Sequence, residues 1–293
     1  MNDDMKLTFT GVGGAFAELF EPARSPIIKG HSNMLFTAES GEIMAFDMGA
    51  YGLLQARDVG VTPMQIRNLI VSHGHCDHVG AMEIFSLAHY FMRKGQPKPK
   101  LILHEKLADE NSNESLWTHF MRLGSRTLQN GVATLDTFYD VVSLQDNDSF
   151  KWEGWTFQLV QTVHVMSGYA IMPSYGLMFQ RSSGEGKKYF ISGDTQFNPE
   201  QLQDRYEEAD WIWHDCETLP IDMRSRVHSH YNHMKVGMSD EIKARTSLYH
   251  YSDVPEDFDD SGFAELVTRG QEYVLWAKHN SGFYPTLWTN IMI

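Results

Sequence analysis

The segment His73-Gly74-His75-Cys76-Asp77-His78 places three imidazoles and one carboxylate within six residues. Residues 68–71 before it form a short apolar run that is expected to be a buried strand, and residues 81–90 after it have helical apolar spacing. The polar side chains are therefore expected on a strand-to-helix loop. Neutral imidazole and carboxylate ligands suit zinc, and also iron or manganese. This loop predicts a fold built around a metal centre.

The order of residues in the loop indicates two metals. His73 and His75 alternate with Gly and Cys, so their side chains can point the same way, whereas Asp77 and His78 are offset by the turn and can face a second ion. A solvated, histidine-rich loop is the plain alternative. Two or three ligands for each of two metals seldom arise by accident, so we favour the metal site.

Four further polar residues follow predicted strands: His164, Asp194, Asp215 and His250. Taken singly, a histidine after a strand is often a hydrogen-bonded core residue, and Asp in Gly-Asp-Thr is often a turn residue or a cap. Strand ends converge in an α/β fold, so these distant residues can meet. Together with the loop they supply a ligand set of the right size for two metals.

The charge of the chain limits its partners. The formal net charge is −14, from 24 basic and 38 acidic residues. Tight binding to long nucleic acid depends on neutralising many phosphates, so this balance opposes it. A metal-lined pocket can still hold a single phosphate.

The 293 residues, 42% of them apolar, are expected to form one globular domain, residues 1–293. Cys76 and Cys216 provide no disulfide framework. The sequence shows no signal peptide and no apolar run long enough for a membrane helix, which gives cytoplasmic residence as the default.

Two regions outside the polar residues carry predictions of their own. Residues 105–135 are read as a helical insertion, a lid or a dimer element, in which residues 116–128 offer apolar side chains without a partner in the core pattern. A homodimer with this insertion near the active-site mouth is therefore expected. The glycine loop at residues 11–14 either cradles an anion or merely turns, and residues 247–249 are expected to be the last strand.

The HxHxDH loop, the histidine after a strand, Gly-Asp-Thr and the strand-terminal histidine together resemble the metallo-β-lactamase superfamily. The resemblance implies an α/β fold, a four-layer αβ/βα sandwich with a dinuclear site between the sheets. It implies two Zn²⁺ ions per chain, with Mn²⁺ or Fe²⁺ as alternatives. One ion would be held by His73, His75, His164 and Asp194, and the other by Asp77, His78, Asp194 and His250, with Asp194 as the bridge.

Three segments narrow the resemblance to the ribonuclease Z-like phosphodiesterases. Residues 5–14 look like the opening of these proteins, residues 214–218 resemble their His-Glu-Ala-Thr segment with Asp215 in the Glu position, and residues 228–230 resemble their His-Ser-Thr segment. Cyclic-nucleotide phosphodiesterases belong to this branch, as do the phage anti-Pycsar proteins, which destroy cyclic-nucleotide immune signals. The tRNA-processing members carry a long arm between two positions that here are His164 and Asp194, which are only 30 positions apart.

The missing arm and the acidic charge favour a small cyclic phosphodiester over tRNA. The resemblance implies that the 3′ oxygen leaves, so that a 3′,5′-cyclic mononucleotide would be hydrolysed to its 5′-monophosphate. By resemblance, Asp77 lies at the reacting centre, and His228, oriented by Asp215, is the first candidate to protonate the leaving oxygen. His230 is the second candidate. The plain alternative is that both are surface histidines in a polar loop. The alternatives are a ribonuclease Z-like endoribonuclease, an ester, thioester or lactam hydrolase of the same fold, and a metal-binding sensor without catalysis.

Overall fold

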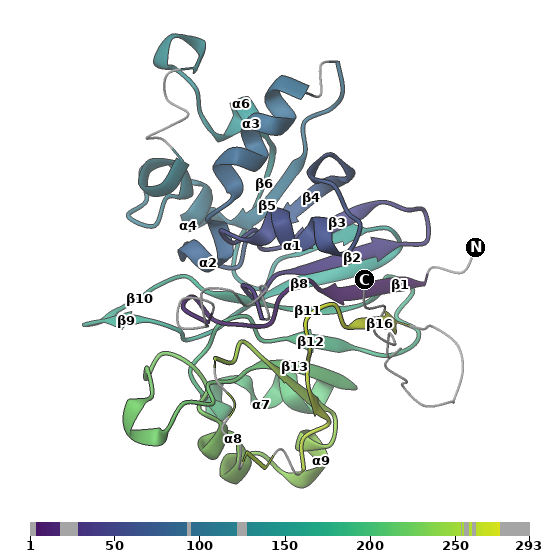
Figure 1. Ribbon diagram of the computed structural model, residues 1–293, viewed down its shortest axis with the longest axis vertical. Coiled ribbons are helices and arrows are strands. Elements are labelled where there is room, and N and C mark those ends of the chain that lie inside the picture. The colour runs from purple at the N-terminus through teal and green to yellow at the C-terminus, as the bar shows by residue number, and fades with distance from the viewer. Residues whose placement is uncertain are drawn as a thin grey trace.

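The structure is a computed structural model that describes residues 4–17, 29–92, 95–121, 128–252, 254, 258–259 and 262–275. Within these ranges, the helices are all too short or too polar to cross a membrane. Two seven-stranded mixed sheets face each other, and helices cover the outer side of each (Figure 1).

The first sheet has the strand order β16-β1-β2-β3-β4-β5-β6. Its amino-terminal strands are antiparallel, whereas β3, β4, β5 and β6 run parallel, so the carboxyl ends of these four meet at one edge. The strands are β1 (Met5–Phe9), β2 (Met34–Ala38), β3 (Ile43–Phe46), β4 (Ile66–Ile70), β5 (Lys100–His104), β6 (Asp140–Leu144) and β16 (Glu272–Leu275).

The second sheet has the order β15-β14-β13-β12-β11-β8-β7. Both β8 and β12 are antiparallel to β11, and β12, β13 and β14 are mutually parallel, so these four strands end at the same edge. The strands are β7 (Ser149–Trp152), β8 (Trp155–Gln161), β11 (Tyr175–Arg181), β12 (Tyr189–Ile191), β13 (Trp211–Asp215), β14 (Thr246–Tyr249) and β15 (Glu265–Leu266).

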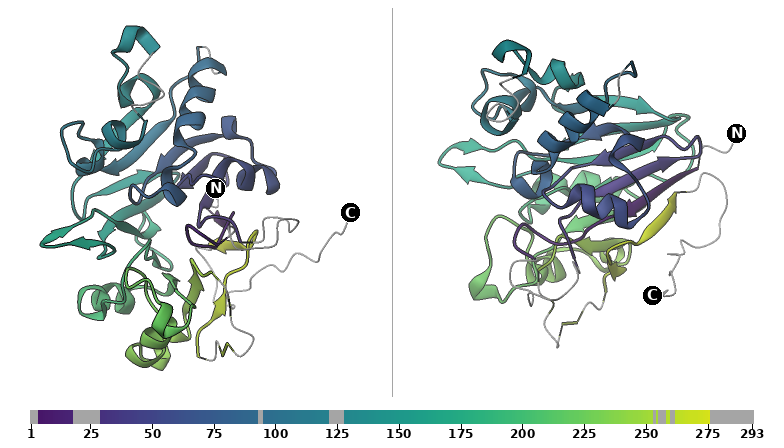
Figure 2. Two further views of the ribbon diagram at one scale, coloured as in Figure 1. Left: turned by 60° about the vertical axis from the view of Figure 1, so that its left-hand side comes forward. Right: turned by 45° about the horizontal axis from the view of Figure 1, so that its top comes forward.

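Three buried apolar clusters hold the layers together. Phe36, Phe157 and Trp213 belong to the core between the sheets, and the other two clusters lie under the helices of each side. Figures 1 and 2 show the resulting αβ/βα order of layers, which confirms the predicted four-layer sandwich. The main covering helices are α1 (Gly52–Asp58), α3 (Met82–Met92) and α6 (Leu135–Phe138) on one side, and α7 (Pro199–Glu208), α8 (Tyr231–Gly237) and α9 (Asp240–Lys243) on the other.

Short elements complete the connections. The hairpin of β9 (Met166–Ser167) and β10 (Ala170–Ile171) projects from the body of the molecule directly after β8 (Figures 1 and 2). The remaining helical turns are η1 (Pro63–Gln65), α2 (Cys76–Val79), α4 (Glu105–Ala108), η2 (Trp117–Met121), η3 (Leu128–Gly131) and η4 (Ile221–Met223).

Two expectations about individual elements were wrong. Residues 247–249 do form a strand, but it is not the last, because β15 extends the second sheet and β16 pairs with β1. The apolar residues of the stretch 116–128 do have core partners: Leu116, Trp117 and Met121 are buried against the outer face of the first sheet. Residues 122–127 of this stretch lie outside the described residues.

Candidate metal centre

The histidine loop lies where the first sheet meets the second. After β4 ends at Ile70, His73 is buried and His75 is half-buried, and the single turn of α2 then carries Asp77 and His78 into the interior. The turn packs tightly on the segment after β3: a Cβ atom at Gly49 would lie 1.8 Å from the carbonyl oxygen of Asp77. This close approach requires glycine at position 49 and fixes the turn that aims the two side chains.

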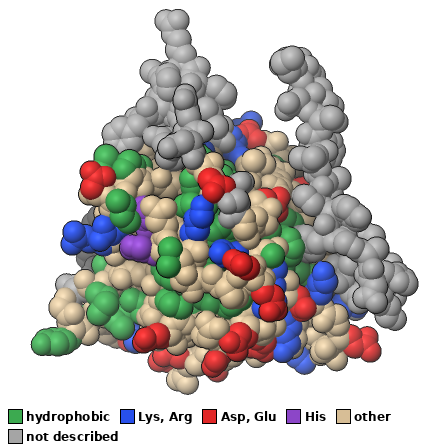
Figure 3. All heavy atoms as spheres, turned by 90° about the horizontal axis from the view of Figure 1, so that it is seen from below, with side chains coloured by type: hydrophobic (Ala, Val, Ile, Leu, Met, Phe, Trp, Pro, Cys, Tyr) green, Lys and Arg blue, Asp and Glu red, His purple; other side chains and the backbone are tan. Residues whose placement is uncertain are grey.

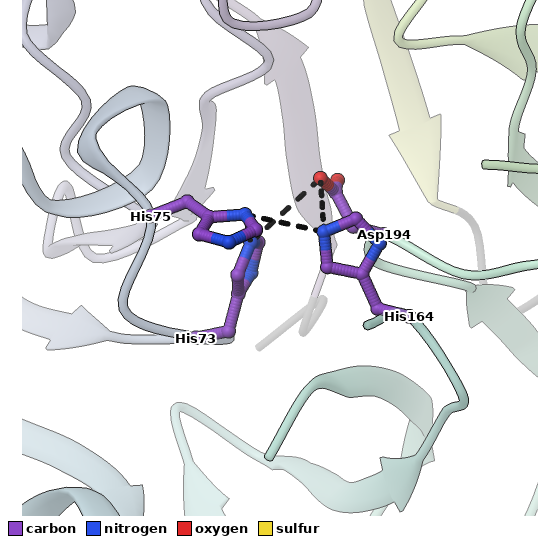
Figure 4. A group of neighbouring side chains, drawn as sticks. All are labelled: His73, His75, His164 and Asp194. Atoms are coloured by element: carbon purple, nitrogen blue, oxygen red, sulfur yellow. Dashed lines mark hydrogen bonds and ion pairs between the residues drawn. The ribbon is translucent and has the colours of Figure 1, made fainter. Parts of the chain in front are cut away.

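The first ligand group joins the two sheets. His73 and His75 come from the loop, and His164 and Asp194 follow β8 and β12 of the opposite sheet (Figure 4). His75 Nδ1 lies 3.0 Å from His73 Nε2 and 3.2 Å from His164 Nε2. Asp194 Oδ2 lies 3.7 Å from both of these ε nitrogens. Three ring nitrogens and one carboxylate oxygen therefore face a common centre.

The second ligand group shares the same carboxylate. Asp194 Oδ2 lies 3.2 Å from His78 Nε2 and 3.3 Å from His250 Nε2. Asp77 Oδ2 closes the group, at 3.2 Å from His78 Nε2 and 3.5 Å from His250 Nε2. All seven residues predicted as metal ligands are thus brought together in two groups that meet at Asp194, as the bridging arrangement requires.

The hydrogen bonds around the histidines suit metal binding. His164 Nδ1 donates to the carbonyl oxygen of Val227 at 2.8 Å, and His78 Nδ1 donates to Asp47 Oδ2 at 2.7 Å. Each bond leaves the lone pair of Nε2 directed at the centre, which is the usual way a neighbouring group orients a ligating imidazole. Within the described chain, His78 Nε2, His250 Nε2 and Asp194 Oδ1 are buried without a hydrogen-bond partner.

The electrostatics of the cluster also indicates that it binds cations. Burial alone would raise the pKa of Asp194, but His250 and His78 hold it well below its usual value. Burial likewise opposes charge on His78, yet Asp194, Asp77 and Asp47 raise the pKa of this imidazole well above its usual value. Buried carboxylates at this density require cations beside them, because an unpaired buried charge is very costly. Divalent metals such as zinc fit this cluster, because they bind imidazole and carboxylate, would partner the unpaired atoms and would supply the positive charge.

Beside the two groups lies the predicted proton donor. His228 Nδ1 is 2.9 Å from Asp215 Oδ2, and the His228 ring lies 4.5 Å from that of His250 and 4.8 Å from that of His164. Burial lowers the pKa of His228, but Asp215 outweighs it and raises the pKa. Asp215, at the end of β13, has its own pKa lowered to about 2 because His228 and His250 overcome its burial. The predicted orientation of His228 by Asp215 is present.

The second candidate donor has a different role. His230 is buried at the start of α8, where Nδ1 accepts the backbone N–H of Asn232 at 3.2 Å and Nε2 donates to the Leu219 carbonyl at 2.8 Å. With both nitrogens engaged in capping a helix and closing a loop, His230 has no free proton to offer a substrate. These contacts favour His228 over His230 as the proton donor.

Two carboxylates that support the site were not expected. Asp47, after β3, accepts from the Ser72 backbone N–H at 2.8 Å and from the Ser72 hydroxyl at 2.7 Å, in addition to His78. It has a positive φ of 67°. Glu217 is buried and accepts from the backbone N–H and the hydroxyl of Ser225, at 2.7 and 3.1 Å. The position of Asp47 at a strand end is the same signal that identified Asp194, and could have found it.

The comparisons with known proteins place the chain in a family. The family model described as anti-Pycsar protein Apyc1 matches residues 5–273. The chain belongs to the anti-Pycsar protein Apyc1 family. An Apyc1 protein of Bacillus phage 010DV004 is 28% identical over 285 residues, covering 94% of this chain and all of its own length. One from Paenibacillus harenae is 26% identical over 272 residues, covering 92% of this chain and 99% of its own length.

A solved structure supports the same fold. The metallo-β-lactamase fold protein YhfI from Bacillus subtilis aligns with a TM-score of 0.64 at 19% identity, covering 93% of this chain and all of its own. The chain therefore has the metallo-β-lactamase fold, as the motifs predicted. It is a hydrolase of this fold from the Apyc1 family, with a buried cluster of histidine and aspartate side chains at the junction of its sheets.

Proposed function

We propose that this protein is a phosphodiesterase that opens a 3′,5′-cyclic mononucleotide to its 5′-monophosphate and so defeats cyclic-nucleotide immune signalling. The observation that carries the proposal is the pairing of a double ligand group, joined at Asp194, with an adjacent histidine that Asp215 orients. The name of the Apyc1 family supports the immune context. The site of action would be the cytoplasm of a bacterium or of a phage-infected host cell.

The proposed resident ions are two Zn²⁺ per chain, with Mn²⁺ or Fe²⁺ as alternatives. His73, His75, His164 and Asp194 would hold one ion, and Asp77, His78, Asp194 and His250 the other. When bound, two such ions supply an activated water and offset the charge that builds on the phosphoryl oxygens. Asp77 would therefore act at the reacting centre as a ligand of the second ion, beside His78 and His250.

The chain itself supplies the proton for the leaving group. His228 is partly exposed, with 18% of its side chain open to solvent, and its Nδ1 faces Asp215. This leaves Nε2 to donate to the 3′ oxygen as its bond to phosphorus breaks. Asp215 stabilises the imidazolium before the transfer and fixes the orientation of the ring.

A small substrate fits both the connection after β8 and the charge of the molecule. The tRNA-processing members of the resembled family carry a long arm after the strand that corresponds to β8. At this place the chain has the short β9–β10 hairpin, followed by β11 and β12 of the second sheet. On the face shown in Figure 3, Lys and Arg side chains are interspersed with Asp and Glu instead of gathering into one basic stripe. A ligand held by the metal pocket needs no such stripe.

We also propose a homodimer, through the exposed face of α3. Ile84, Phe91 and Met92 are 61%, 55% and 72% exposed, and apart from Glu83 this helix contains no Asp, Glu, Lys or Arg. Two copies with a net charge of −14 repel one another least across an uncharged face, and an apolar helix face can pair with itself about a twofold axis. A second copy of the chain is therefore the partner that we expect to bind the exposed face of α3.

Light scattering tests the assembly. The wild type should have twice the chain mass of 33.6 kDa at micromolar concentration, and Ile84→Glu combined with Phe91→Glu should halve it. Val236→Glu, on the exposed face of α8, is the matched control and should remain dimeric. A monomeric wild type, or a double variant that stays dimeric, would reject this interface.

A panel of substrates tests the activity. Zinc-loaded protein is assayed on 3′,5′-cyclic mononucleotides, bis-p-nitrophenyl phosphate, a thioester and a precursor tRNA, with Asp194→Ala as the inactive control. We expect the highest kcat/KM on a cyclic mononucleotide, with little dependence on salt because few counterions are displaced. A preference for the tRNA would support the endoribonuclease alternative, and turnover of the thioester alone would show an acyl hydrolase.

A further inference from the structure

The loop between β13 and α8 carries an arginine with strained backbone, Arg226, two residues before His228. Five described residues other than glycine have a positive φ: Asp47, Asn147, Glu153, Arg226 and His250. Asp47 and His250 belong to the metal centre, and Asn147 and Glu153 lie in turns. Arg226, with φ of 67°, has neither explanation. Strained backbone of this kind persists only where surrounding contacts impose it, and it concentrates at functional sites.

Those contacts are visible on both sides of Arg226. The buried carboxylate of Glu217 holds Ser225 through two hydrogen bonds, and the Ser225 hydroxyl in turn accepts the backbone N–H of Val227 at 3.3 Å. The backbone is therefore fixed one residue before and one residue after Arg226. These hydrogen bonds hold the backbone in a conformation that glycine or asparagine normally adopts, although the residue here is an arginine.

The two residues that follow Arg226 both contact the ligand groups. The carbonyl of Val227, the next residue, accepts the hydrogen bond of His164 at 2.8 Å. The residue after that is His228, whose ring contacts both His164 and His250. Neighbouring Cα atoms are about 3.8 Å apart, so the flexible side chain of Arg226 starts one residue away from a contact of the first ligand group.

The guanidinium of Arg226 is available for a ligand. The side chain is exposed, and the structure gives it neither a hydrogen bond nor an ion pair within the described chain. Arg224, two residues earlier, differs in this respect, because its Nη1 donates to the carbonyl of Ile221 at 2.7 Å.

We propose that Arg226 binds the phosphate of the substrate at the mouth of the metal centre. The inference rests on the proposed phosphodiesterase function and adds a specific anion contact to it. A guanidinium matches two oxygens of a phosphate with two parallel hydrogen bonds, and it keeps its charge at every relevant pH. Arg226 thus attracts the anionic substrate across an acidic surface and positions its phosphate; it takes no part in proton transfer.

The test compares two arginines of one loop. Arg226→Asn removes the guanidinium but suits the positive φ, so it should fold as well as the wild type. Arg224→Ala removes the same charge from the same loop and is the matched control. KM and kcat are measured with zinc-loaded protein on a cyclic mononucleotide and on bis-p-nitrophenyl phosphate, and calorimetry measures the Kd of inorganic phosphate.

Arg226→Asn should raise KM on both substrates and the phosphate Kd by about 10-fold, with kcat within about twofold of the wild type. Arg226→Lys should restore part of the loss, and Arg224→Ala should change none of these values. A rise in KM for the cyclic nucleotide alone would overturn the phosphate assignment in favour of contact with the nucleoside. Unchanged KM and Kd would overturn it altogether. If cyclic nucleotides are not substrates, the proposed function fails, and the phosphate Kd still decides the role of Arg226.

Discussion

Among single residues, the proposed metal ligands and the proposed proton donor His228 have separate roles. The ligands converge on Asp194, whereas His228 Nδ1 is 4.0 Å from Asp194 Oδ2 and 2.9 Å from Asp215. His228→Ala should therefore leave the metal content intact. It should lower kcat on a cyclic nucleotide by about 10²- to 10⁴-fold, the usual contribution of a general acid.

The leaving group provides the decisive comparison for this prediction. Nitrophenolate departs without a proton, so His228→Ala should affect bis-p-nitrophenyl phosphate far less than a cyclic nucleotide. His233→Ala, an exposed histidine of α8, should change neither rate. Equal losses on the two substrates would show that His228 is not the acid.

Asp47 gives a second prediction, because it determines which nitrogen of His78 carries the proton. In Asp47→Asn, the amide oxygen can still accept from Ser72, but the amide nitrogen donates to His78 Nδ1 and places the proton on Nε2. The affinity for the second ion should fall about 10- to 100-fold, measured by competition with a zinc chelator. Asp47→Ala leaves the tautomer free and should lose less; an Asn variant that retains the wild-type affinity would refute this account.

The histidine loop could be anticipated from its local density along the chain, a signal that neither Asp47 nor Glu217 has. Asp47 offers only its position after a strand, the weaker signal that also marked Asp194. His73, His75, Asp77 and His78 are dense along the chain, and a metal cluster is recognisable from such local density. Asp47 and Glu217 have roles only through partners brought near by folding: Asp47 meets Ser72 and His78 from the neighbouring strand, and Glu217 meets a loop residue. Ordinary acidic residues acquire such functions from tertiary contacts.

At the level of elements, the loop of residues 217–230 links His164, a proposed metal ligand, to His228, the proposed proton donor. Its backbone is closed by Glu217 N–H to Ser229 O at 2.8 Å, and the Glu217 carboxylate holds Ser225. Glu217→Ala should speed amide hydrogen exchange across this loop and lower kcat on a cyclic nucleotide more than on the nitrophenyl ester. The reason is that His228 loses its fixed position.

Asp222→Ala is the matched control for the loop, since Asp222 is exposed in η4. It should change neither the exchange nor the rates. Glu217→Gln can retain a bond to the Ser225 N–H and should recover part of the activity. A Glu217→Ala variant with wild-type exchange in the loop would remove the proposed role of this carboxylate.

Elements with local signals were predictable, and those formed by distant pairing were not. The turn at Glu153-Gly154 has a local sequence signal, because its second residue is glycine, and both residues have positive φ, of 47° and 78°. The capping box of Thr62 and Gln65 is likewise present, although the helix it begins, η1, has only three residues. By contrast, β16 pairs Leu275 with Met5, near the other end of the chain, and no local pattern signals such a contact.

For the molecule as a whole, the metal groups join two halves of the chain. His73, Asp77 and His78 follow β4 of the first sheet, whereas His164, Asp194 and His250 follow strands of the second. The apolar core between the sheets also holds them together. Ions bound at this junction therefore act as a second connection between the sheets, and their removal leaves buried carboxylates without their intended partners.

Removal of the metals should consequently lower the thermal stability. A ligand at 100 times its Kd stabilises the folded state by about 2.7 kcal/mol, which for each ion corresponds to roughly 5 °C or more in Tm. Calorimetric scans before and after dialysis against EDTA, with zinc measured by elemental analysis, should show about two equivalents lost and Tm lowered, both restored by added zinc. Asp194→Ala removes the shared ligand, so its Tm should not respond to EDTA. A wild type that loses its zinc with no change in Tm would show that the junction of the sheets does not depend on the ions.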